Sequence, residues 1–483
     1  MTSVARRQAS ARHAGAQAYP EPGPSATPPP SRSSRGLGVR PGTVRPHKEG
    51  GRVSAQLVLG IIALGALVVI ALWWHSTPDV SGLGGWLTGA GEMLGLLAGY
   101  GVVVLVALMA RLPPLERGIG TDSLARWHAM GGRYVVSVVW AHALLIVWGY
   151  AVEAHTSVTG ETAALLTQYP DVLMATVGGF LLLGVGLISM RAARRRVRYE
   201  TWYYLHLYTY LAIALAFSHQ FANGQAFINN LAARFWWSAM YLTVAVLIAW
   251  YRFAVPLLAF RRHSFHVIGV KPEGPGVVSV YIGGSHLDDL DAEPGQFFRW
   301  RFLTRSLWWS SHPYSLSAAP GQDILRITAK DLGDHSQALA RLRPGTRVIA
   351  EGPYGAFTAT GSGRGVLLLA GGVGITPLRA MFATLPGQVT LIYRASSEQD
   401  IVFRDELDAI AAARGATVHY VVGSRAELGG DPLSPRVLRS LAPDLDQQEV
   451  YVCGPDGMTS AAVEALRAAG VPKRSIHRES FEF

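Results

Sequence analysis

The sequence contains very little cysteine, since Cys453 is the only one among its 483 residues. A lone thiol excludes an internal disulfide, and it also excludes an iron–sulfur cluster held by four cysteines. Charged side chains are scarce too, at 16% of residues, whereas 49% of residues are hydrophobic. A soluble protein of this length would carry more charge, so part of the chain is expected to lie in a membrane.

Residues 1–52 contain few acidic and few large apolar side chains but are rich in Pro, Ser, Gly and Arg. Such a composition does not bury enough apolar surface to offset the entropy of folding, so a disordered tail is predicted. An acid-poor start rich in Arg and Ser is also typical of a transit peptide, although no amphipathic pattern supports that alternative. Much of the net charge of +10 lies in this tail and beside apolar stretches, so it does not indicate nucleic-acid binding.

Residues 53–260 contain six apolar stretches, each long enough to cross about 30 Å of hydrocarbon as a helix. The connections 75–85 and 153–171 contain no Lys or Arg, whereas the second and fourth connections carry several. Because cytoplasmic segments of membrane proteins are enriched in these residues, both chain ends are predicted to be cytoplasmic, with Arg234 as the one exception. A soluble bundle of apolar helices would not show this alternation. The stretches are 56–74, 86–110, 127–150, 171–190, 201–221 and 235–258.

Four histidines lie inside two of these stretches: His128 and His142 in the third, and His206 and His219 in the fifth. Ionisable side chains are costly in hydrocarbon and tend to mark a functional site. At a rise of about 1.5 Å per residue, the two members of each pair are about 20 Å apart along their helix. Because the helices run in the same direction, His128 is expected level with His206. His142 is likewise expected level with His219, so two bis-histidine haem sites at two depths are predicted.

The spacing within the fifth stretch does not fit an ideal helix. Fourteen positions return a side chain to nearly the same face, whereas the thirteen positions from His206 to His219 leave the two well apart in angle. Rotation of a haem, a tilted helix or a locally tightened turn would compensate, and the sequence does not decide among them. The alternative is four histidines that hydrogen-bond between helices or line a proton path.

Residues 261–360 contain short strand-like runs broken by Gly and Pro, which predicts a small antiparallel β-barrel. Within it, the ring of Tyr314 is suited to lie on a flavin and the hydroxyl of Ser315 to reach its edge, although the motif also fits a plain strand entry. Residues 333–336 open a short helix whose amides suit a pyrophosphate, or form an ordinary helix cap. The candidate flavin-binding residues are His312, Pro313, Tyr314, Ser315, Gly333, His335 and Ser336.

Residues 361–483 alternate strand-like and helix-like segments, which is typical of an α/β, Rossmann-like domain that binds a nicotinamide nucleotide. In the turn 371–377 the glycines let the backbone approach a phosphate, and Pro377 is expected to start the next helix. The turn 453–458 follows another strand and is expected at the same edge of the sheet, whereas one Gly-rich turn alone is not specific. The candidate residues are Gly371, Gly372, Gly374, Thr376, Pro377, Cys453, Gly454 and Pro455.

Together these motifs resemble the ferric reductase and NADPH oxidase superfamily, in which a six-helix haem domain is joined to a ferredoxin–NADP reductase-like module. The similarity covers roughly residues 55–483, and the histidine pairs, HPYS, GGVGITP and CGPDGM occur in the family's order. The resemblance implies that the four histidines hold two b-type haems and that the β-barrel binds FAD. It further implies catalytic roles for Cys453, beside the nicotinamide, and for Phe483, on the flavin ring.

Two arginines that follow strands of the last domain, Arg394 and Arg425, bear on the choice of nucleotide. Both are expected near the adenosine end, and Ser424-Arg425 is similar to the Ser-Arg that NADP-preferring relatives use for the 2′-phosphate. An arginine can bind that group with two hydrogen bonds, so NADPH is favoured over NADH. A solvated loop arginine is the ordinary alternative.

The resemblance implies a cell-membrane oxidoreductase that passes electrons from cytoplasmic NADPH through FAD and two haems to an outer acceptor, either oxygen or a ferric chelate. One departure concerns oxygen, because animal NADPH oxidases carry a further histidine where this chain has Ile146. Two alternatives stay open: an electron-donating subunit for a membrane or periplasmic partner protein, and a haem-free transporter or channel regulated by a nucleotide.

Overall fold

The structure, a computed structural model, describes residues 53–77, 80–190, 197, 199–321, 323–358 and 365–480. The tail predicted at residues 1–52 and the candidate Phe483 lie outside the described residues.

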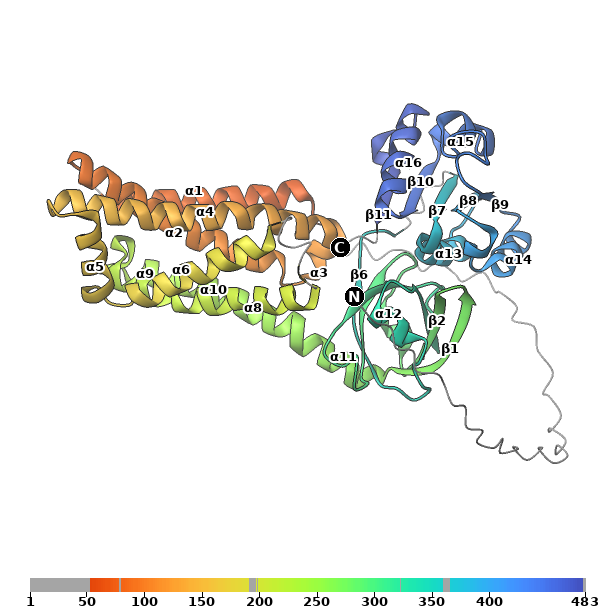
Figure 1. Cartoon of the computed structure of the whole chain (residues 1–483), viewed down its shortest axis with the longest axis horizontal. Helices are drawn as coiled ribbons and strands as arrows, with labels where there is room; N and C mark the ends of the chain where they lie inside the picture. Colours follow the sequence, from red (N-terminus) through yellow and green to blue (C-terminus); the bar gives the residue numbers. More distant parts are fainter. Residues whose placement is uncertain are drawn as a thin grey trace, which may run out of the picture. The chain divides into compact units, whose positions relative to one another are not determined.

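Helices account for nearly all of the described residues between 55 and 263, and Figure 1 shows the long ones running beside one another. A single π-helical turn, Trp250–Ala254, continues α10 into α11 without a break. The helices are α1 Ala55–Ser76, α2 Gly82–Leu108, α3 Pro113–Gly118, α4 Thr121–Glu153, α5 Val158–Gln168, α6 Val172–Ser189, α8 Tyr199–Leu215, α9 Phe217–Asn223, α10 Leu231–Ala249 and α11 Val255–His263.

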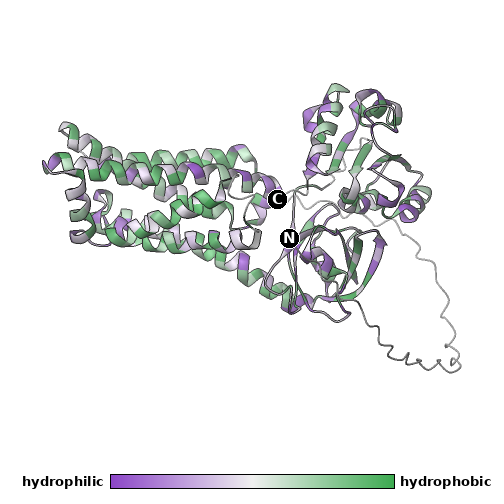
Figure 2. Cartoon of the chain, viewed as in Figure 1, coloured by the Kyte–Doolittle hydropathy of each residue, from purple (hydrophilic) through white to green (hydrophobic). Residues whose placement is uncertain are grey.

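A side chain caps the start of α1, and apolar side chains cover its outer face. The Ser54 hydroxyl accepts a hydrogen bond from the Leu57 N–H at 3.2 Å, a cap that stabilises a helix by about 1 kcal/mol. The side chains of Leu64 and Leu67 on α1 are each 62% exposed. Apolar residues also predominate along the other long helices, as Figure 2 shows. Exposed apolar faces of this length suit contact with lipid, so this region is a membrane domain.

Six uninterrupted spans are not confirmed. Among the described residues, five helices are long and apolar enough to cross a membrane. The stretch 201–221 is not one of them, because Ala216 interrupts it with φ −88° and ψ −1° and so divides it into α8 and α9. The five are Ala55–Ser76, Gly82–Leu108, Thr121–Glu153, Val172–Ser189 and Leu231–His263.

Two three-stranded antiparallel sheets follow the helices, in the orders β1-β2-β5 and β4-β3-β6. Their facing side chains form one core, in which Trp300, Phe302 and Ile282 are fully buried. Among the described residues the two sheets are joined only by isolated bridges, between His266 and Arg347 and between Leu316 and Ile327, so the predicted antiparallel β-barrel is not confirmed. The elements are β1 His266–Gly274, β2 Val277–Gly283, β3 Phe297–Phe302, β4 His312–Ser315, β5 Ile324–Lys330, α12 Asp334–Leu339 and β6 Val348–Tyr354.

The last part is a five-stranded parallel sheet with the order β11-β10-β7-β8-β9, which agrees with the predicted Rossmann-like domain. Every residue of the central strand β7 is buried, as expected for a strand covered on both faces. Strand order reverses between β7 and β10, and ligands of such sheets bind at the carboxyl edge of this point. The elements are β7 Val366–Gly371, α13 Ile375–Thr384, β8 Val389–Ala395, α14 Arg404–Arg414, β9 Thr417–Val422, α15 Pro435–Leu441, β10 Glu449–Gly454, α16 Asp456–Ala468 and β11 Ile476–Ser480.

Candidate functional site

The four histidines of the membrane domain lie in the two pairs that the sequence predicts. The ring centroids of His128 and His206 are 5.8 Å apart. Those of His142 and His219 are 6.5 Å apart. Iron–imidazole bonds of about 2 Å on either side of one metal would place two ring centroids about 6 Å apart. Both pairs therefore fit bis-histidine ligation of a haem.

Hydrogen bonds to backbone carbonyls orient the two histidine rings on α4 in a way that suits ligation of a metal. The Nδ1–H of His128 donates to the Leu105 carbonyl at 3.0 Å, and that of His142 donates to the Gly91 carbonyl at 2.8 Å. A ligand histidine whose Nδ1 is bound in this way presents Nε2 to the metal in a fixed orientation. His206 is held differently, because its ring stacks on Trp202 with centroids 5.2 Å apart.

The break at Ala216 lies between the two histidines of the fifth stretch. In an uninterrupted helix the thirteen positions between His206 and His219 would leave the two rings far apart in angle. Here α8 ends at Leu215, α9 begins at Phe217, and the Nδ1–H of His219 donates to the freed Ala216 carbonyl. The helix is interrupted between the two histidines, which is a local change other than the tightened turn considered above.

The two predicted flavin motifs come together on one face of the antiparallel sheets. His312, Pro313, Tyr314 and Ser315 form β4, and the Tyr314 hydroxyl lies 3.3 Å from His335 Nδ1. The rings of His312 and His335 have centroids 3.6 Å apart. Burial, reinforced by His312, lowers the pKa of His335 to about 3, so this ring is neutral at physiological pH. A neutral His335 ring beside the Tyr314 ring suits contact with a flavin.

Residues 333–336 use their polar groups to close the start of the six-residue helix α12. The Gly333 N–H donates to the Asp331 carboxylate at 3.2 Å, with Gly333 at φ +146°. The Ser336 hydroxyl accepts from the Leu332 N–H and donates to the Gly333 carbonyl, each at 2.8 Å. These contacts fold the segment back on itself without a side-chain cap from the N-cap residue Gly333, and a pyrophosphate at this position stays a prediction.

The two Gly-rich turns of the parallel sheet meet at its switch point. A side chain at Gly374 would overlap the Cys453 carbonyl, and one at Gly371 would overlap the sulfur of Met458. A side chain at Gly454 would lie 3.1 Å from the Gly371 backbone, so the turns pack most closely at Gly374, where the Cys453 backbone leaves room for glycine alone. Helix α13 begins at Ile375, two residues before the predicted start at Pro377. Within its first turn the Thr376 hydroxyl donates to the Val373 carbonyl at 3.0 Å.

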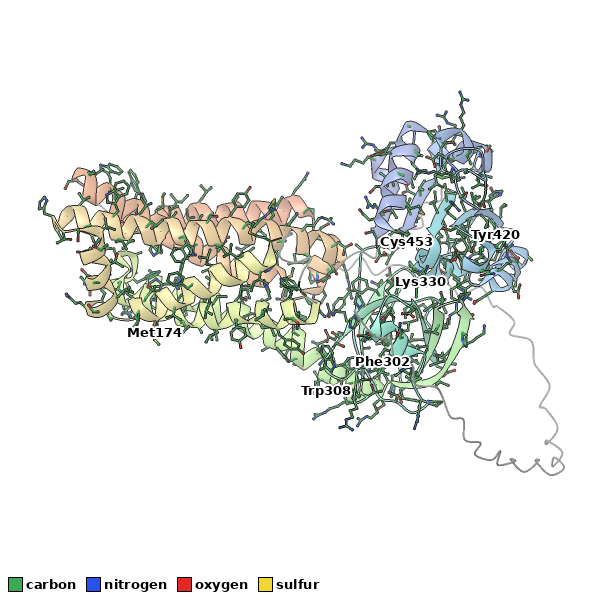
Figure 3. All side chains as sticks on the ribbon, in the orientation of Figure 1. Met174, Phe302, Trp308, Lys330, Tyr420 and Cys453 are labelled. Atoms are coloured by element: carbon green, nitrogen blue, oxygen red, sulfur yellow. The ribbon has the colours of Figure 1, made fainter. Side chains whose placement is uncertain are left out.

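A cavity of about 390 Å³ lies at this edge of the sheet. Lys330, labelled in Figure 3, ends β5 and lines the cavity, although sequence reasoning did not select it. The lining carries its ammonium group and two arginines beside the carboxylates of Asp400 and Asp431, and the three basic groups suit the phosphates of a nucleotide. The lining includes Lys330, Gly371, Gly372, Arg394, Arg425 and Pro455.

The two arginines of the cavity are bound in different ways. The guanidinium of Arg394 donates to the carbonyls of Val421, at 3.1 Å, and Gly423, and so ties β8 to the end of β9. The side chain of Arg425 is 73% exposed, and its nearest acidic partner, Asp431, lies 3.9 Å away. Arg425 therefore keeps its donors available for a ligand, whereas Arg394 supports the backbone.

A second group that sequence reasoning missed is Glu479, which the parallel pairing of β10 and β11 places beside Cys453. Burial raises the pKa of the Cys453 thiol, and burial also raises the pKa of Glu479 to about 8. Within the described part of the chain, Glu479 Oε2 has no hydrogen-bond partner. The feature of the sequence that could have indicated Glu479 was its position near the carboxyl end of the last strand, next to the strand that leads into the CGPDGM turn.

Glutamine in place of Glu479 is expected to flatten the pH dependence of stability. Because the pKa of this carboxyl is raised from 4.5 to about 8, the folded chain keeps a proton that the unfolded chain loses. Its contribution to stability is fully present below pH 4.5 and is lost as the pH rises through about 8. Thermal unfolding of the full chain, followed by tryptophan fluorescence across this range, should decline less for Glu479→Gln. Identical profiles would contradict the assignment.

Comparisons with known protein families divide the chain in the same way as its structure. The family described as ferric reductase like transmembrane component matches residues 94–217. An FAD-binding domain family matches residues 276–358, and an oxidoreductase NAD-binding domain family matches residues 368–464.

Individual relatives match the strand-containing part. Over 191 residues, the chain is 32% identical to ferredoxin–NADP reductase B of Sorangium cellulosum, covering 35% of this chain and 77% of that protein. It is also 32% identical over 206 residues to the ferredoxin reductase component of 3-ketosteroid-9-alpha-monooxygenase of Mycobacterium tuberculosis, covering 39% of this chain and 54% of that protein. The FAD/NAD-binding domain of nitric oxide dioxygenase from Vibrio cholerae matches 46% of this chain and 99% of its own, with 26% identity and a TM-score of 0.40.

Proposed function

Because the chain belongs to the superfamily of ferric reductases and NADPH oxidases, we propose that it passes electrons from cytoplasmic NADPH, through FAD and two b-type haems, to an acceptor across the cell membrane. The proposed acceptor is oxygen, which would give superoxide, or ferric iron in a chelate. The N-terminus and the flavin and nucleotide domains are proposed to be cytoplasmic, as the alternation of basic connections indicates.

The single observation that carries this proposal is the pairing of four histidines inside the membrane domain. Each pair joins α4 to the segment α8–α9, with ring centroids separated as one iron between them would require. Hydrogen-bonded histidines of a soluble core need no such separation. We assign His128 and His206 to the haem nearer the cytoplasm, and His142 and His219 to the outer haem.

The remaining groups are assigned from the motifs and from the cavity. Tyr314 and His335 would hold the flavin, and the turns of β7 and β10 would hold the nicotinamide nucleotide. Arg425 is proposed to bind the 2′-phosphate that distinguishes NADPH from NADH, because its guanidinium is free to reach the cavity. Cys453 would lie beside the nicotinamide, and Phe483 is proposed to cover the flavin.

The cofactors would supply the electron chemistry, since a flavin accepts one hydride, which carries two electrons, and haems carry single electrons. The residues of the chain would then bind these cofactors and orient them. Ligation by two imidazoles would close each iron to small ligands, so the outer acceptor would receive electrons without binding that metal.

A reduced-minus-oxidised absorption spectrum of the purified chain tests this proposal. We expect b-type bands from two haems per chain after reduction by NADPH in the absence of oxygen. Consumption of NADPH should then follow addition of oxygen or ferric citrate. A chain without haem bands would contradict the proposal and would favour the nucleotide-regulated transporter or channel.

A second candidate is an electron-donating subunit for a partner protein. It is favoured by the relative from Mycobacterium tuberculosis, which is a ferredoxin reductase component of a monooxygenase. Haem bands without turnover on either small acceptor would support this candidate over an oxidase or ferric reductase.

A further inference from the structure

A group of three polar side chains connects His219 to helix α2. The Trp237 indole N–H donates to the Gln220 side-chain oxygen at 2.8 Å. The Gln220 amide in turn donates to the Ala216 carbonyl at 3.2 Å, the same carbonyl that accepts from His219 Nδ1. The position of this ligand ring is therefore coupled, through one shared acceptor, to a residue of α10.

The third side chain fixes the group against α2. The Tyr241 hydroxyl donates to the Gly99 carbonyl at 3.1 Å. A side chain added at Gly99 would lie 2.9 Å from Trp237 and 3.2 Å from the polar ends of both Gln220 and Tyr241. Glycine at this position thus allows all three to converge on the helix backbone.

Helix α2 also holds the opposite ligand. His142 donates to the Gly91 carbonyl, and a side chain at Gly95 would lie 2.8 Å from the His142 ring. Gly91, Gly95 and Gly99 are spaced by four residues and so share one face of α2. Both histidines of this pair are therefore positioned against one face of α2. His142, on α4, contacts this face directly, whereas His219, on α9, is connected to it through Gln220.

The group is well packed. Trp237 is only 5% exposed and lies in a buried cluster with Phe227 and Leu96. Its ring contacts those of Phe227, with centroids 5.3 Å apart, and Tyr241, with centroids 6.2 Å apart. Close packing restricts the indole to one orientation, so its N–H holds the Gln220 amide in place.

We propose that Gln220, Trp237 and Tyr241 form a clamp, called the α2 clamp, that positions His219 and thereby sets the ligand geometry of the haem held by His142 and His219. These are positioning residues, since they act through His219 and not on the iron. The proposal rests on the proposed function, because it assumes a haem between this pair. It assigns no such device to the haem of His128 and His206.

The test compares Trp237→Phe with Trp236→Phe in the purified full chain. The first substitution keeps an aromatic ring but removes the N–H that binds Gln220. The second makes the same chemical change one position away, on a side chain that is 71% exposed. Redox titration and low-temperature EPR report each haem separately, and His219→Ala identifies the signals that belong to the outer pair.

For Trp237→Phe we expect a shift in the potential and EPR signal of the His142–His219 haem alone. Release of that haem to apomyoglobin should become faster by up to about 10-fold, because losing a direct hydrogen-bonding partner of a metal ligand costs about 10-fold to 100-fold and Trp237 acts one step further away, through Gln220. Trp236→Phe should leave both haems unchanged. Gln220→Leu and Tyr241→Phe give milder variants, and the same selective shift in either supports the clamp even where Trp237→Phe does not fold.

Unchanged signals in Trp237→Phe and Gln220→Leu, or equal shifts in both haems, would overturn the clamp. An unsubstituted chain that shows no haem bands would overturn the proposed function itself, and the clamp with it. The two failures are therefore distinguishable in one set of spectra.

Discussion

Alanine in place of His142 or His219 is expected to leave the chain with one haem instead of two. Each substitution removes an axial ligand from the pair whose rings lie 6.5 Å apart. Electron transfer to an outer acceptor should fall by more than about 100-fold, since losing only a hydrogen-bonding partner of a ligand costs up to that much. Haem content by pyridine haemochrome and NADPH-driven reduction of ferric citrate measure the two effects.

The matched control is His75→Ala, because His75 is an exposed histidine in the last turn of α1. It should keep both haems and full turnover. Reduction of ferricyanide by NADPH should persist in all three variants, since it requires only the flavin and nucleotide domains. Two haems retained in both His142→Ala and His219→Ala would show that the ligand assignment is wrong.

Alanine in place of Arg425 is expected to raise the KM for NADPH by about 10-fold to 100-fold. Hydrogen bonds to a charged partner contribute about 1.5–3 kcal/mol, which corresponds to that range in affinity. The KM for NADH should change little, because NADH lacks the 2′-phosphate. Steady-state ferricyanide reduction with both nucleotides measures the ratio.

Two further variants test whether the effect on the KM for NADPH is specific to Arg425. Arg394→Ala should weaken both nucleotides and lower thermal stability, because its guanidinium supports the carbonyls of Val421 and Gly423. Arg436→Ala, an exposed arginine on α15 outside the cavity lining, should leave both KM values unchanged. An Arg425→Ala variant with equal losses for NADPH and NADH would contradict the specificity assignment.

Periodicity and spacing predicted the histidine pairs, because a fixed rise per residue converts sequence separation into depth. The same reasoning could not place the break at Ala216, since the surrounding residues include no Pro or Gly and continue the apolar pattern. The interruption depends on the freed carbonyl that His219 and Gln220 share, which is a tertiary arrangement. For this reason residues 201–221 were predicted as one continuous span, whereas the structure divides them into α8 and α9.

At the carboxyl edge of the parallel sheet, the sequence likewise predicted the local motifs but not the contacts that depend on tertiary structure. The turns at 371–377 and 453–458 were predicted to share one edge because both follow buried parallel strands, and the structure packs Gly374 against Cys453. Assigning different roles to Arg394 and Arg425 required knowledge of which backbone carbonyls lie near each guanidinium. Glu479 escaped notice because its significance comes from the pairing of β10 with β11, which no local pattern encodes.

Burial of Cys453 has a practical consequence for experiments on this protein. Its thiol is fully buried and is the only one in the sequence, so maleimide and methanethiosulfonate reagents should not modify the folded chain. A cysteine introduced at an exposed position such as Leu332, which is 84% exposed, would then be the only reactive one. Fluorophores or spin labels could be attached there without first mutating Cys453.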